Sequence, residues 1–279
     1  ETTVSEINVS VTERLKAVTV AMERERWQNK KDLLSGNIVM RKILVNLTDF
    51  TAKIIDNGIV TFQTRSVVGA DEDDRRSPEF SDVMEHMVIN PTWYVPRSIT
   101  VNEYLPELQI DPAAHSYLTL FAPDGTTIPR EEVDFTLFDE ETFPFEMKQT
   151  PSATNALGLV KFMFPNRHNI YLHDTPQKTL FLKEQRTFSH GCIRLQQPFE
   201  FAYALLALQS EDPVLEFQSI LETGEETIIP LAEPVPVHII YRTAVSTAGG
   251  RMGYRRDIYG RDALIFTALS EAGVVIPQN

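Results

Sequence analysis

Near the start of the sequence, apolar residues recur at the spacing of an α-helix. Ser10 and Glu13 form a capping-box pattern, in which the serine hydroxyl and the glutamate three positions later satisfy backbone N–H groups at a helix start. The apolar residues around them lie three or four positions apart, at Val11, Leu15, Val18 and Met22. Residues with this spacing share one face of a helix, so the pattern predicts an amphipathic helix over 10–27.

Beyond this helix, the pattern changes to that of β-strands. Residues 37–69 are rich in isoleucine, valine, threonine and phenylalanine, and Asn57-Gly58 interrupts them. Both residues of this pair accept a positive φ, which the tight turn of a β-hairpin requires, so a strand is expected on either side. Alternation of apolar with smaller or polar residues predicts further strands at 157–164, 169–173 and 235–245.

Helix start and stop signals predict short helices between these strands. Ser77-Pro78 is typical of an N-cap followed by a proline in the first turn. A short apolar helix face is predicted after it, at Phe80, Val83, Met84 and Met87. Thr100 and Glu103 predict another short helix, which Pro106 is expected to end because proline has no backbone N–H to donate.

The last third of the sequence predicts two more helices. One begins at Pro198 and runs to Leu208. Asp262 is expected to cap a final helix over 263–272, and Gly273 marks its end.

The region 97–155 mixes short pieces with turns and does not read as a regular core, so it is interpreted as an insertion. The predicted organisation is an N-terminal helical segment at 1–36, a catalytic domain at 37–222 that contains this insertion, and a C-terminal strand and helix at 223–279 that pack on it.

The composition is that of a folded globular protein, with 42% apolar and 23% charged residues among 279. The formal net charge of −13 argues against nucleic acid or an anionic membrane surface as the main partner. No apolar run approaches the roughly 18 residues that a transmembrane helix needs. The sequence starts at Glu1 and carries no basic-then-apolar signal segment, so we expect a processed product or a shortened chain.

A single cysteine, Cys192, lies in the stretch RTFSHGCIRL. It cannot form an intramolecular disulfide, so it either packs in the core or carries chemistry, and by itself it leaves the redox compartment open. His173 lies 19 residues earlier, which is enough chain for a strand, a turn and a return.

The predicted strand 169–173 would present two chemically useful side chains together. Alternate residues of a strand share a face, so Ile170 and Leu172 would point into the core. Tyr171 and His173 would then point to the other side, toward a common cleft.

These side chains suffice for acyl transfer through a thioester. A cysteine attacks as the thiolate, and its ordinary pKa of roughly 8.5 leaves only a few per cent ionised near neutral pH. A histidine within hydrogen-bond reach takes the proton, which makes His173 the candidate general base for Cys192. The N–H groups of Gly191 and Cys192 and the Tyr171 hydroxyl are candidate oxyanion donors, because glycine permits the backbone torsion required.

Each of these residues also has a purely structural explanation. A lone cysteine is more often a small buried hydrophobe than a nucleophile, and His190 or Arg194 alone is an ordinary loop residue. A zinc site from His173, His190 and Cys192 is a further alternative, but the sequence holds no Cys-x-x-Cys or His-Glu-x-x-His pattern. The local signatures of papain-type and caspase-type proteases are absent as well.

Ser189-His190-Gly191-Cys192-Ile-Arg194-Leu, with Tyr-Leu-His-Asp upstream at 171–174, resembles the motif of the L,D-transpeptidase (YkuD-type) catalytic domain. That family carries a histidine, a stretch of about this length, and then S/T-H-G-C-x-R/N. Further segments look like those of the long, Gram-negative subgroup: VINPTWYVPRSI at 88–99, FPNRHNIYLHDTP at 164–176 and RRDIYGRD at 255–262. The resemblance covers most of the chain, from about Arg14 to Asp262.

By position, the resemblance implies Cys192 as the nucleophile and His173 as the general base. It implies that the backbone carbonyl of Asp174 orients the histidine. The N–H groups of Gly191 and Cys192, with the Tyr171 hydroxyl, would form the oxyanion hole.

The remaining motif residues are implied substrate-binding candidates. Ser189 lies in the motif, and His190 matches the family's supporting histidine, which shapes the loop and the acceptor side. Arg194 would brace the loop or meet a substrate carboxylate. Trp93, with Asn90, lies in a segment expected to line the cleft edge, although packing explains both equally well.

The implied fold is a β-rich α+β fold, with a YkuD-type, sandwich-like or barrel-like catalytic domain, an inserted cap subdomain and flanking helices. The implied location is the periplasm, and the implied substrate is a peptidoglycan tetrapeptide stem that loses its terminal D-Ala. The acyl group would pass to the side-chain amine of a second stem, giving 3-3 cross-links. No metal or organic cofactor is implied, and carbapenems are expected to acylate the cysteine.

Several alternatives stay open at this point. An amine of an outer-membrane protein or a water molecule would serve as acceptor with the same catalytic residues. A non-catalytic wall-binding module with this fold would have an unreactive thiol. Long family members usually carry a separate peptidoglycan-binding domain ahead of this region, whereas only the predicted helix 10–27 precedes the strands here.

Overall fold

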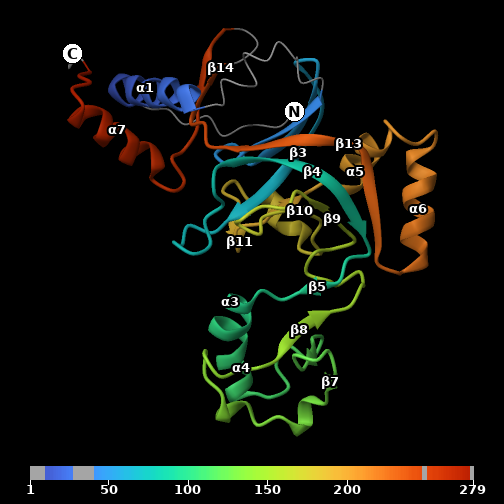
Figure 1. The fold of residues 1–279 in the computed structure, drawn as a ribbon. Helices are drawn as coiled ribbons and strands as arrows, with labels where there is room; N and C mark the ends of the chain where they lie inside the picture. Colours follow the sequence, from blue (N-terminus) through green and yellow to red (C-terminus); the bar gives the residue numbers. More distant parts are fainter. Residues whose placement is uncertain (1–9, 28–40, 247–249, 277–279) are drawn as a thin grey trace.

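A computed structural model describes residues 10–27, 41–246 and 250–276. Among these residues, nine strands form one sheet in the order β11-β3-β12-β10-β9-β4-β13-β1-β2, and β2 also pairs with β3. That last pairing closes the sheet into a barrel, with β11 added along β3 (Figure 1). The strands are β1 (Arg41–Asn46), β2 (Thr51–Asp56), β3 (Ile59–Gly69), β4 (Phe80–Ile89), β9 (Val160–Met163), β10 (Leu172–His173), β11 (Thr187–Ser189), β12 (Ile193–Leu195) and β13 (Thr227–Ile240).

The predicted hairpin forms at the junction of β2 and β3. Asn57 and Gly58 both have positive φ, at 50° and 80°, as the tight turn requires. The β-rich architecture with flanking helices is confirmed. The predicted cut between 37–222 and 223–279 stays a prediction, although β13 lies between β4 and β1 and is therefore a full member of the barrel.

Two helices cover the barrel wall. α5 (Pro198–Leu206) contacts β3, and α6 (Pro213–Thr223) contacts β4. Each inserts a fully buried ring, Phe201 or Phe217, into the main core. Burial of one such side chain stabilises a fold by about 1.5–3 kcal/mol. α5 confirms the helix expected from the proline at its start, whereas α6 was not predicted.

A smaller lobe, here named the cap lobe (residues 93–157), lies beside the barrel and has its own core (Figure 1). Its sheet has the order β5-β8-β6-β7. Its core contains buried side chains that do not belong to the barrel core, among them Leu108, Leu120 and Phe143. Its elements are β5 (Trp93–Tyr94), α3 (Arg97–Ile99), η1 (Thr100–Tyr104), α4 (Leu105–Ile110), β6 (Thr119–Phe121), β7 (Thr127–Ile128), η2 (Arg130–Glu132), η3 (Phe135–Leu137) and β8 (Glu146–Gln149).

The helix of the cap lobe corrects the expectation for Pro106. Helical structure begins at Arg97 and continues past Pro106 to Ile110, instead of ending at the proline. The π-helical turn η1 lies just before it, and the Leu105 N–H bonds to the Thr100 carbonyl across that wider turn. A π turn shifts the hydrogen-bond register, which accommodates a residue that has no N–H of its own.

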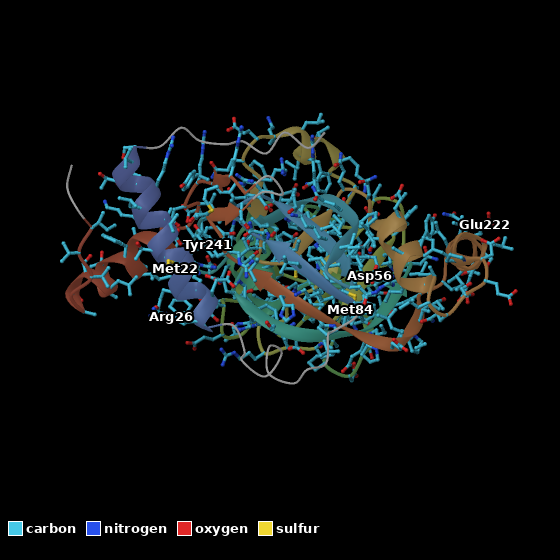
Figure 2. All side chains as sticks on the ribbon, turned by 90° about the horizontal axis from the view of Figure 1, so that it is seen from above. Met22, Arg26, Asp56, Met84, Glu222 and Tyr241 are labelled. Carbon is cyan, nitrogen blue, oxygen red and sulfur yellow. The ribbon has the colours of Figure 1, made fainter. Side chains whose placement is uncertain are left out.

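The opposite end of the molecule is formed by α1 (Val11–Trp27), α7 (Arg261–Glu271) and the hairpin of β14 (Ala244–Ser246) and β15 (Met252–Tyr254). Figure 2 shows α1, with Met22 and Arg26, at one end and Glu222 of α6 at the other. A short 3-10 helix, η4 (Lys178–Leu182), lies between β10 and β11. Within the described ranges, no helix is long and apolar enough to span a bilayer.

The helix 10–27 is confirmed, but its predicted buried face is wrong. The Glu13 N–H donates to the Ser10 hydroxyl at 3.2 Å, as the capping box requires. Val11 and Met22 are nevertheless about 60% exposed (59% and 62%), while Arg24 is buried. α1 docks by ion pairs from Arg24 and not by the apolar stripe, which is why hydrophobic spacing misplaced its face.

Two further expectations are corrected. The stretch after Ser77-Pro78 is strand β4, because Met87 pairs with neighbours on both sides inside the sheet, and tertiary pairing overrides the helical spacing. Asp262 lies in the first turn of α7 and is not its cap, since Gly260 occupies that position. Gly273, with φ of 96°, follows the helix end as expected.

Candidate active site

Strands β10 and β12 bring the predicted catalytic residues to one face of the barrel wall. The two strands run parallel, with His173 beside Arg194. Leu172 and its neighbour Ile193 have no exposed surface and point into the core. The residues that alternate with them along each strand therefore project to the other face, among them His173 and Arg194.

Tyr171 and Cys192 come immediately before these two strands. The Ile193 N–H donates to the Tyr171 carbonyl at 3.1 Å, which sets this register. The Tyr171 and His173 rings lie 5.6 Å apart, as expected for alternate residues of a strand. The pairing places Cys192 beside Tyr171 and makes His173 its diagonal neighbour.

The thiol of Cys192 is partly buried and is held near the start of β10. Its Sγ donates to the Asn169 carbonyl at 3.6 Å. Burial raises the pKa of Cys192 to about 11, while hydrogen bonds from Tyr171 and the charge of Arg194 act in the opposite direction. Burial beside the thiol also raises the pKa of Tyr171 well above its usual value. Both groups are therefore protonated at neutral pH.

His173 is buried and electrically neutral. Burial and then the nearby Arg194 lower its pKa to about 3, and backbone groups of Asp174 and Leu157 oppose that shift only partly. Its Nδ1 has no hydrogen-bond partner among the described residues. A neutral imidazole on the same face as a thiol is the protonation state that general-base catalysis starts from.

The loop before Cys192 is held by hydrogen bonds from within the motif. The Ser189 hydroxyl accepts from the Gly191 N–H at 3.2 Å and donates to the Cys192 carbonyl. The Gly191 N–H is therefore bonded to Ser189 in this structure, and its role as an oxyanion donor stays a prediction. Gly191 has a φ of 104°, and a Cβ there would lie 3.1 Å from Ile170 Cδ1, so glycine is required at this position.

Two residues outside the motif support this loop. The buried Ser77 hydroxyl donates to the Gly191 carbonyl at 2.6 Å. His190 Nε2 lies 2.9 Å from Glu103 Oε1 in the cap lobe, and the same carboxylate pairs with Arg75 at 3.0 Å. Tyr171 contacts the cores of both the barrel and the cap lobe. The cap lobe is thus attached directly to the candidate site.

A row of cations crosses the site at the level of His173. In the sheet register, Lys161 of β9 is the neighbour of His173 on one side, and Arg194 of β12 is its neighbour on the other. Burial lowers the pKa of both Lys161 and Arg194. Sequence reasoning missed Lys161, Ser77 and Glu103. The alternation in VKFM at 160–163 is the one signal that places Lys161 on the face away from the core.

Two predicted substrate-binding residues, Asp174 and Trp93, are buried and contact other parts of the protein. The buried Asp174 carboxylate accepts from the Leu159 and Thr175 N–H groups and pairs with Lys178. Trp93 is 8% exposed and packs edge-to-face on Tyr104 inside the cap lobe, so the structure places it in a core and not along a cleft. Asn90 is likewise buried.

The zinc alternative finds no support in the geometry. Within residues 10–27, 41–246 and 250–276, no three His, Cys, Asp or Glu side chains are grouped so that they could hold a metal ion.

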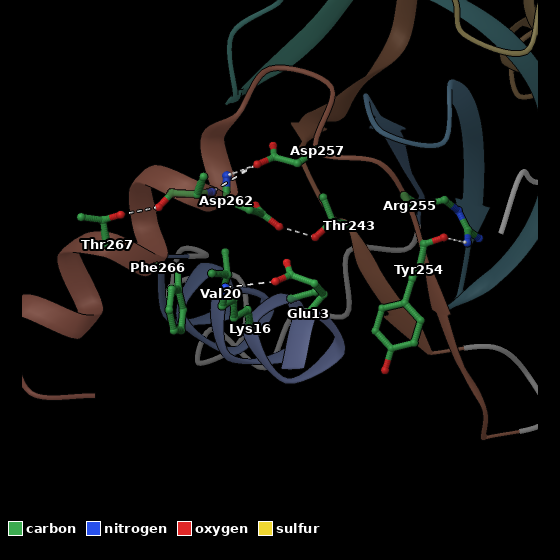
Figure 3. Close-up of a pocket in the computed structure, with 12 residues that line it drawn as sticks. Glu13, Lys16, Val20, Thr243, Tyr254, Arg255, Asp257, Asp262, Phe266 and Thr267 are labelled. Carbon is green, nitrogen blue, oxygen red and sulfur yellow. Dashed lines mark hydrogen bonds and ion pairs between the residues drawn. The ribbon is translucent and has the colours of Figure 1, made fainter. Parts of the chain in front are cut away.

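A pocket of roughly 330 Å³ lies at the far end of the molecule, between α1, α7 and the β14–β15 hairpin (Figure 3). Its lining includes Thr243, Arg255 and Asp262. None of its residues belongs to β10 or β12, so it is separate from the candidate site.

The chain is similar to known proteins over most of its length. The model of the YkuD family, described as an L,D-transpeptidase catalytic domain, matches residues 40–229. A curated protein of Haemophilus influenzae, named "Putative L,D-transpeptidase", is 28% identical over 249 residues, which are 88% of this chain and 48% of that protein. The chain spans about half the length of this relative.

Solved structures with similarity include two L,D-transpeptidases. One, from Mycobacterium smegmatis, is 10% identical with a TM-score of 0.32, covering 72% of this chain and 58% of that chain. The other, the catalytic domain from E. faecium, is 14% identical with a TM-score of 0.30, covering 74% and 100%.

Proposed function

This chain belongs to the YkuD family of L,D-transpeptidase catalytic domains, and from that premise we propose that it cross-links peptidoglycan stems through a cysteine thioester. The observation that supports this most directly is the shared face of Cys192 and His173, with the histidine in its neutral state. The chain contains one cysteine, so the proposed nucleophile has no competitor.

In the proposed donor step, His173 accepts the thiol proton as Cys192 Sγ attacks the carbonyl between the diamino acid and the terminal D-Ala of a tetrapeptide stem. Because the thiol and the imidazole are both neutral at rest, this proton transfer accompanies the attack. The Cys192 N–H and the Tyr171 hydroxyl are the proposed donors to the oxyanion. The carbon–nitrogen bond then breaks, His173 returns the proton to the D-Ala nitrogen, and a thioester remains.

In the proposed acceptor step, the side-chain amine of a second stem attacks the thioester. One proton of that amine passes to His173 and then to the departing thiolate. The reaction breaks one amide bond and forms another, so it consumes no cofactor, and the product is a 3-3 cross-link. The proposed location is the periplasm, where such stems are found.

The test is incubation of the protein with a purified disaccharide-tetrapeptide, followed by mass spectrometry of the products. The proposal predicts a dimer that has lost one D-Ala, and no dimer with Cys192→Ala. A trimmed monomer would instead identify water as the acceptor, and a protein adduct would identify a protein amine. Cross-linking that persists in Cys192→Ala would refute the mechanism.

A second experiment separates an enzyme from a wall-binding module. Intact-mass measurement after carbapenem treatment should show one adduct per chain on Cys192, because an activated thiol opens the lactam ring. A folded protein without that adduct would favour the binding module.

A further inference from the structure

Lys161, His173 and Arg194 form one transverse row on the face of three neighbouring strands that points away from the barrel core. Lys161 is the pairing partner of His173 on β9, and Arg194 is its pairing partner on β12. Each of the three positions alternates with a core residue, so all three side chains emerge on the same side of the wall. The candidate general base is therefore flanked by a cation on each side.

Neither of these two cations has an acidic partner in the part of the chain that the structure describes. Arg194 Nη1 donates to the neutral amide of Gln177 at 2.6 Å, and Arg194 Nε is buried without any hydrogen-bond partner. Among the described residues, no carboxylate lies within ion-pair distance of Arg194 or Lys161. The charge of Glu226 opposes the lowering of the Lys161 pKa, but the Glu226 Oε2 accepts from the Thr92 N–H.

Buried cations without counterions are costly unless something neutralises them when they act. Arg24, which is also buried, meets the carboxylate of Asp262, whereas buried Arg255 donates to the Tyr254 carbonyl. An unmatched pair on either side of the base therefore indicates a site for an anionic group of the substrate.

We propose that Lys161 and Arg194 bind the terminal carboxylate of the donor stem, that is, the carboxylate of the residue that leaves. This inference rests on the proposed function. The leaving nitrogen must lie against His173 to receive its proton, and the carboxylate of the leaving residue is two bonds from that nitrogen. A carboxylate so placed falls into the row that the two cations form.

This arrangement selects stems by length. A stem with one more residue places a peptide group, and not a carboxylate, next to the cations. A tetrapeptide stem is then preferred because it alone places a negative charge beside the two cations at the moment of bond cleavage. Lys161 is a specificity-determining residue in this view, since it contacts the part of the donor that departs.

The test measures D-Ala release from three synthetic donors. The first is the native tetrapeptide, the second carries a terminal D-Ala amide, and the third is amidated only on the side-chain carboxylate of the diamino acid. We expect kcat/KM of the native protein to be at least about tenfold lower for the terminal amide, because charge-assisted hydrogen bonds are lost. The third donor should behave like the first.

Variants assign the effect to Lys161. Lys161→Met should lose about tenfold on the native donor and change less than about twofold on the terminal amide. Lys42→Met is the matched control, because Lys42 is also a half-buried strand lysine but lies on β1, across the barrel. Thermal unfolding of each variant shows that the fold is retained.

Three outcomes would overturn the inference. The first is an equal kcat/KM of the native protein for the native tetrapeptide and for its terminal amide. The second is an equal loss of kcat/KM on these two donors in Lys161→Met. The third is that Lys161→Met lowers kcat/KM on every donor except the one amidated on the side chain of the diamino acid. A native protein that forms the carbapenem adduct but releases D-Ala from no donor would instead refute the proposed function, and the inference would fall with it.

Discussion

The hydroxyl of Ser77 donates a 2.6 Å hydrogen bond to the carbonyl of Gly191, 114 residues later in the chain. The same hydroxyl accepts from the Gly69 N–H at 2.9 Å. Ser77 has no exposed surface and joins the end of β3 to the loop that carries Cys192. The position of the thiol therefore depends on a residue far outside the motif that contains it.

Replacing Ser77 should weaken both the fold and the site. Ser77→Ala leaves a buried carbonyl and a buried N–H without a partner, which costs about 1–3 kcal/mol of unfolding free energy. We also expect slower carbapenem acylation, because the Cys192 loop loses its anchor. Ser81→Ala is the control, since Ser81 is exposed and should change stability by less than about 0.5 kcal/mol. Equal stability of the two variants in urea unfolding would contradict this assignment.

The pH profile of acylation distinguishes attack assisted by His173 from attack by a free thiolate. With a His173 pKa of about 3, the imidazole is neutral throughout mild acid, so the acylation rate should be nearly flat between about pH 5 and 8. In His173→Gln only the thiolate reacts, and the Cys192 pKa of about 11 predicts a rise of about tenfold per pH unit. Stopped-flow kinetics would measure both profiles. A tenfold slope in the native protein would exclude His173 as the base.

His173 should also make stability depend on pH. Its pKa is lowered from 6.5 in the unfolded chain to about 3 in the fold, so between these values the unfolded chain binds more protons. The free energy of unfolding should therefore fall as pH drops from about 6.5 toward 3, by up to about 1.4 kcal/mol per pH unit from this group. His173→Gln removes this contribution. Urea unfolding of both proteins at several pH values isolates it, and parallel curves would show that His173 is not buried in its neutral form.

Glu103 should matter for activity more than for stability. Its carboxylate connects the cap lobe to His190 and Arg75, but it is 28% exposed, and such pairs contribute about 0–1 kcal/mol. We expect Glu103→Gln to raise KM for the stem donor several-fold with little change in the midpoint of thermal unfolding. Glu107→Gln is the control, because Glu107 pairs with His115 inside the cap lobe. An identical KM in the two variants would mean that donor binding does not depend on the contact of Glu103 with His190 and Arg75.

Sequence reasoning succeeded where local chemistry determines the structure. Asn57-Gly58 forms the predicted turn because only certain residues accept its backbone angles. Tyr171 and His173 share a face because strand alternation is a property of the backbone. The motif around Cys192 is similarly local, which is why its family could be identified from a few residues.

Sequence reasoning failed where residues distant in sequence determine the local structure. The helical spacing after Ser77 is real, yet β4 forms because β9 and β13 pair with it. Lys161 and Glu103 reach the site only through the register of β9 and the placement of the cap lobe. The alternation around Lys161 indicates the face of its strand, but neither Lys161 nor Glu103 has adjacent residues that indicate its distant partner.

Arg24 illustrates the same limit and gives the last prediction. Its guanidinium is 6% exposed, pairs with Asp262 at 3.0 Å and with Glu79 at 2.5 Å, and stacks over Tyr241. Arg24→Met leaves the Asp262 carboxylate buried without its cation, and burial already raises the pKa of that carboxylate. Removing one partner of such a pair should cost about 3–5 kcal/mol of unfolding free energy.

The double variant Arg24→Met/Asp262→Asn should lose less than the sum of the two single variants, because neither charge is then stranded. Arg26→Met is the matched control on the same helix, since the Arg26 side chain is 73% exposed and should change stability by less than about 0.5 kcal/mol. Urea unfolding followed by circular dichroism measures the native protein and all four variants. If Arg24→Met were as stable as Arg26→Met, α1 would have to be held by contacts other than this ion pair, and the apolar stripe first predicted for it would become the stronger explanation.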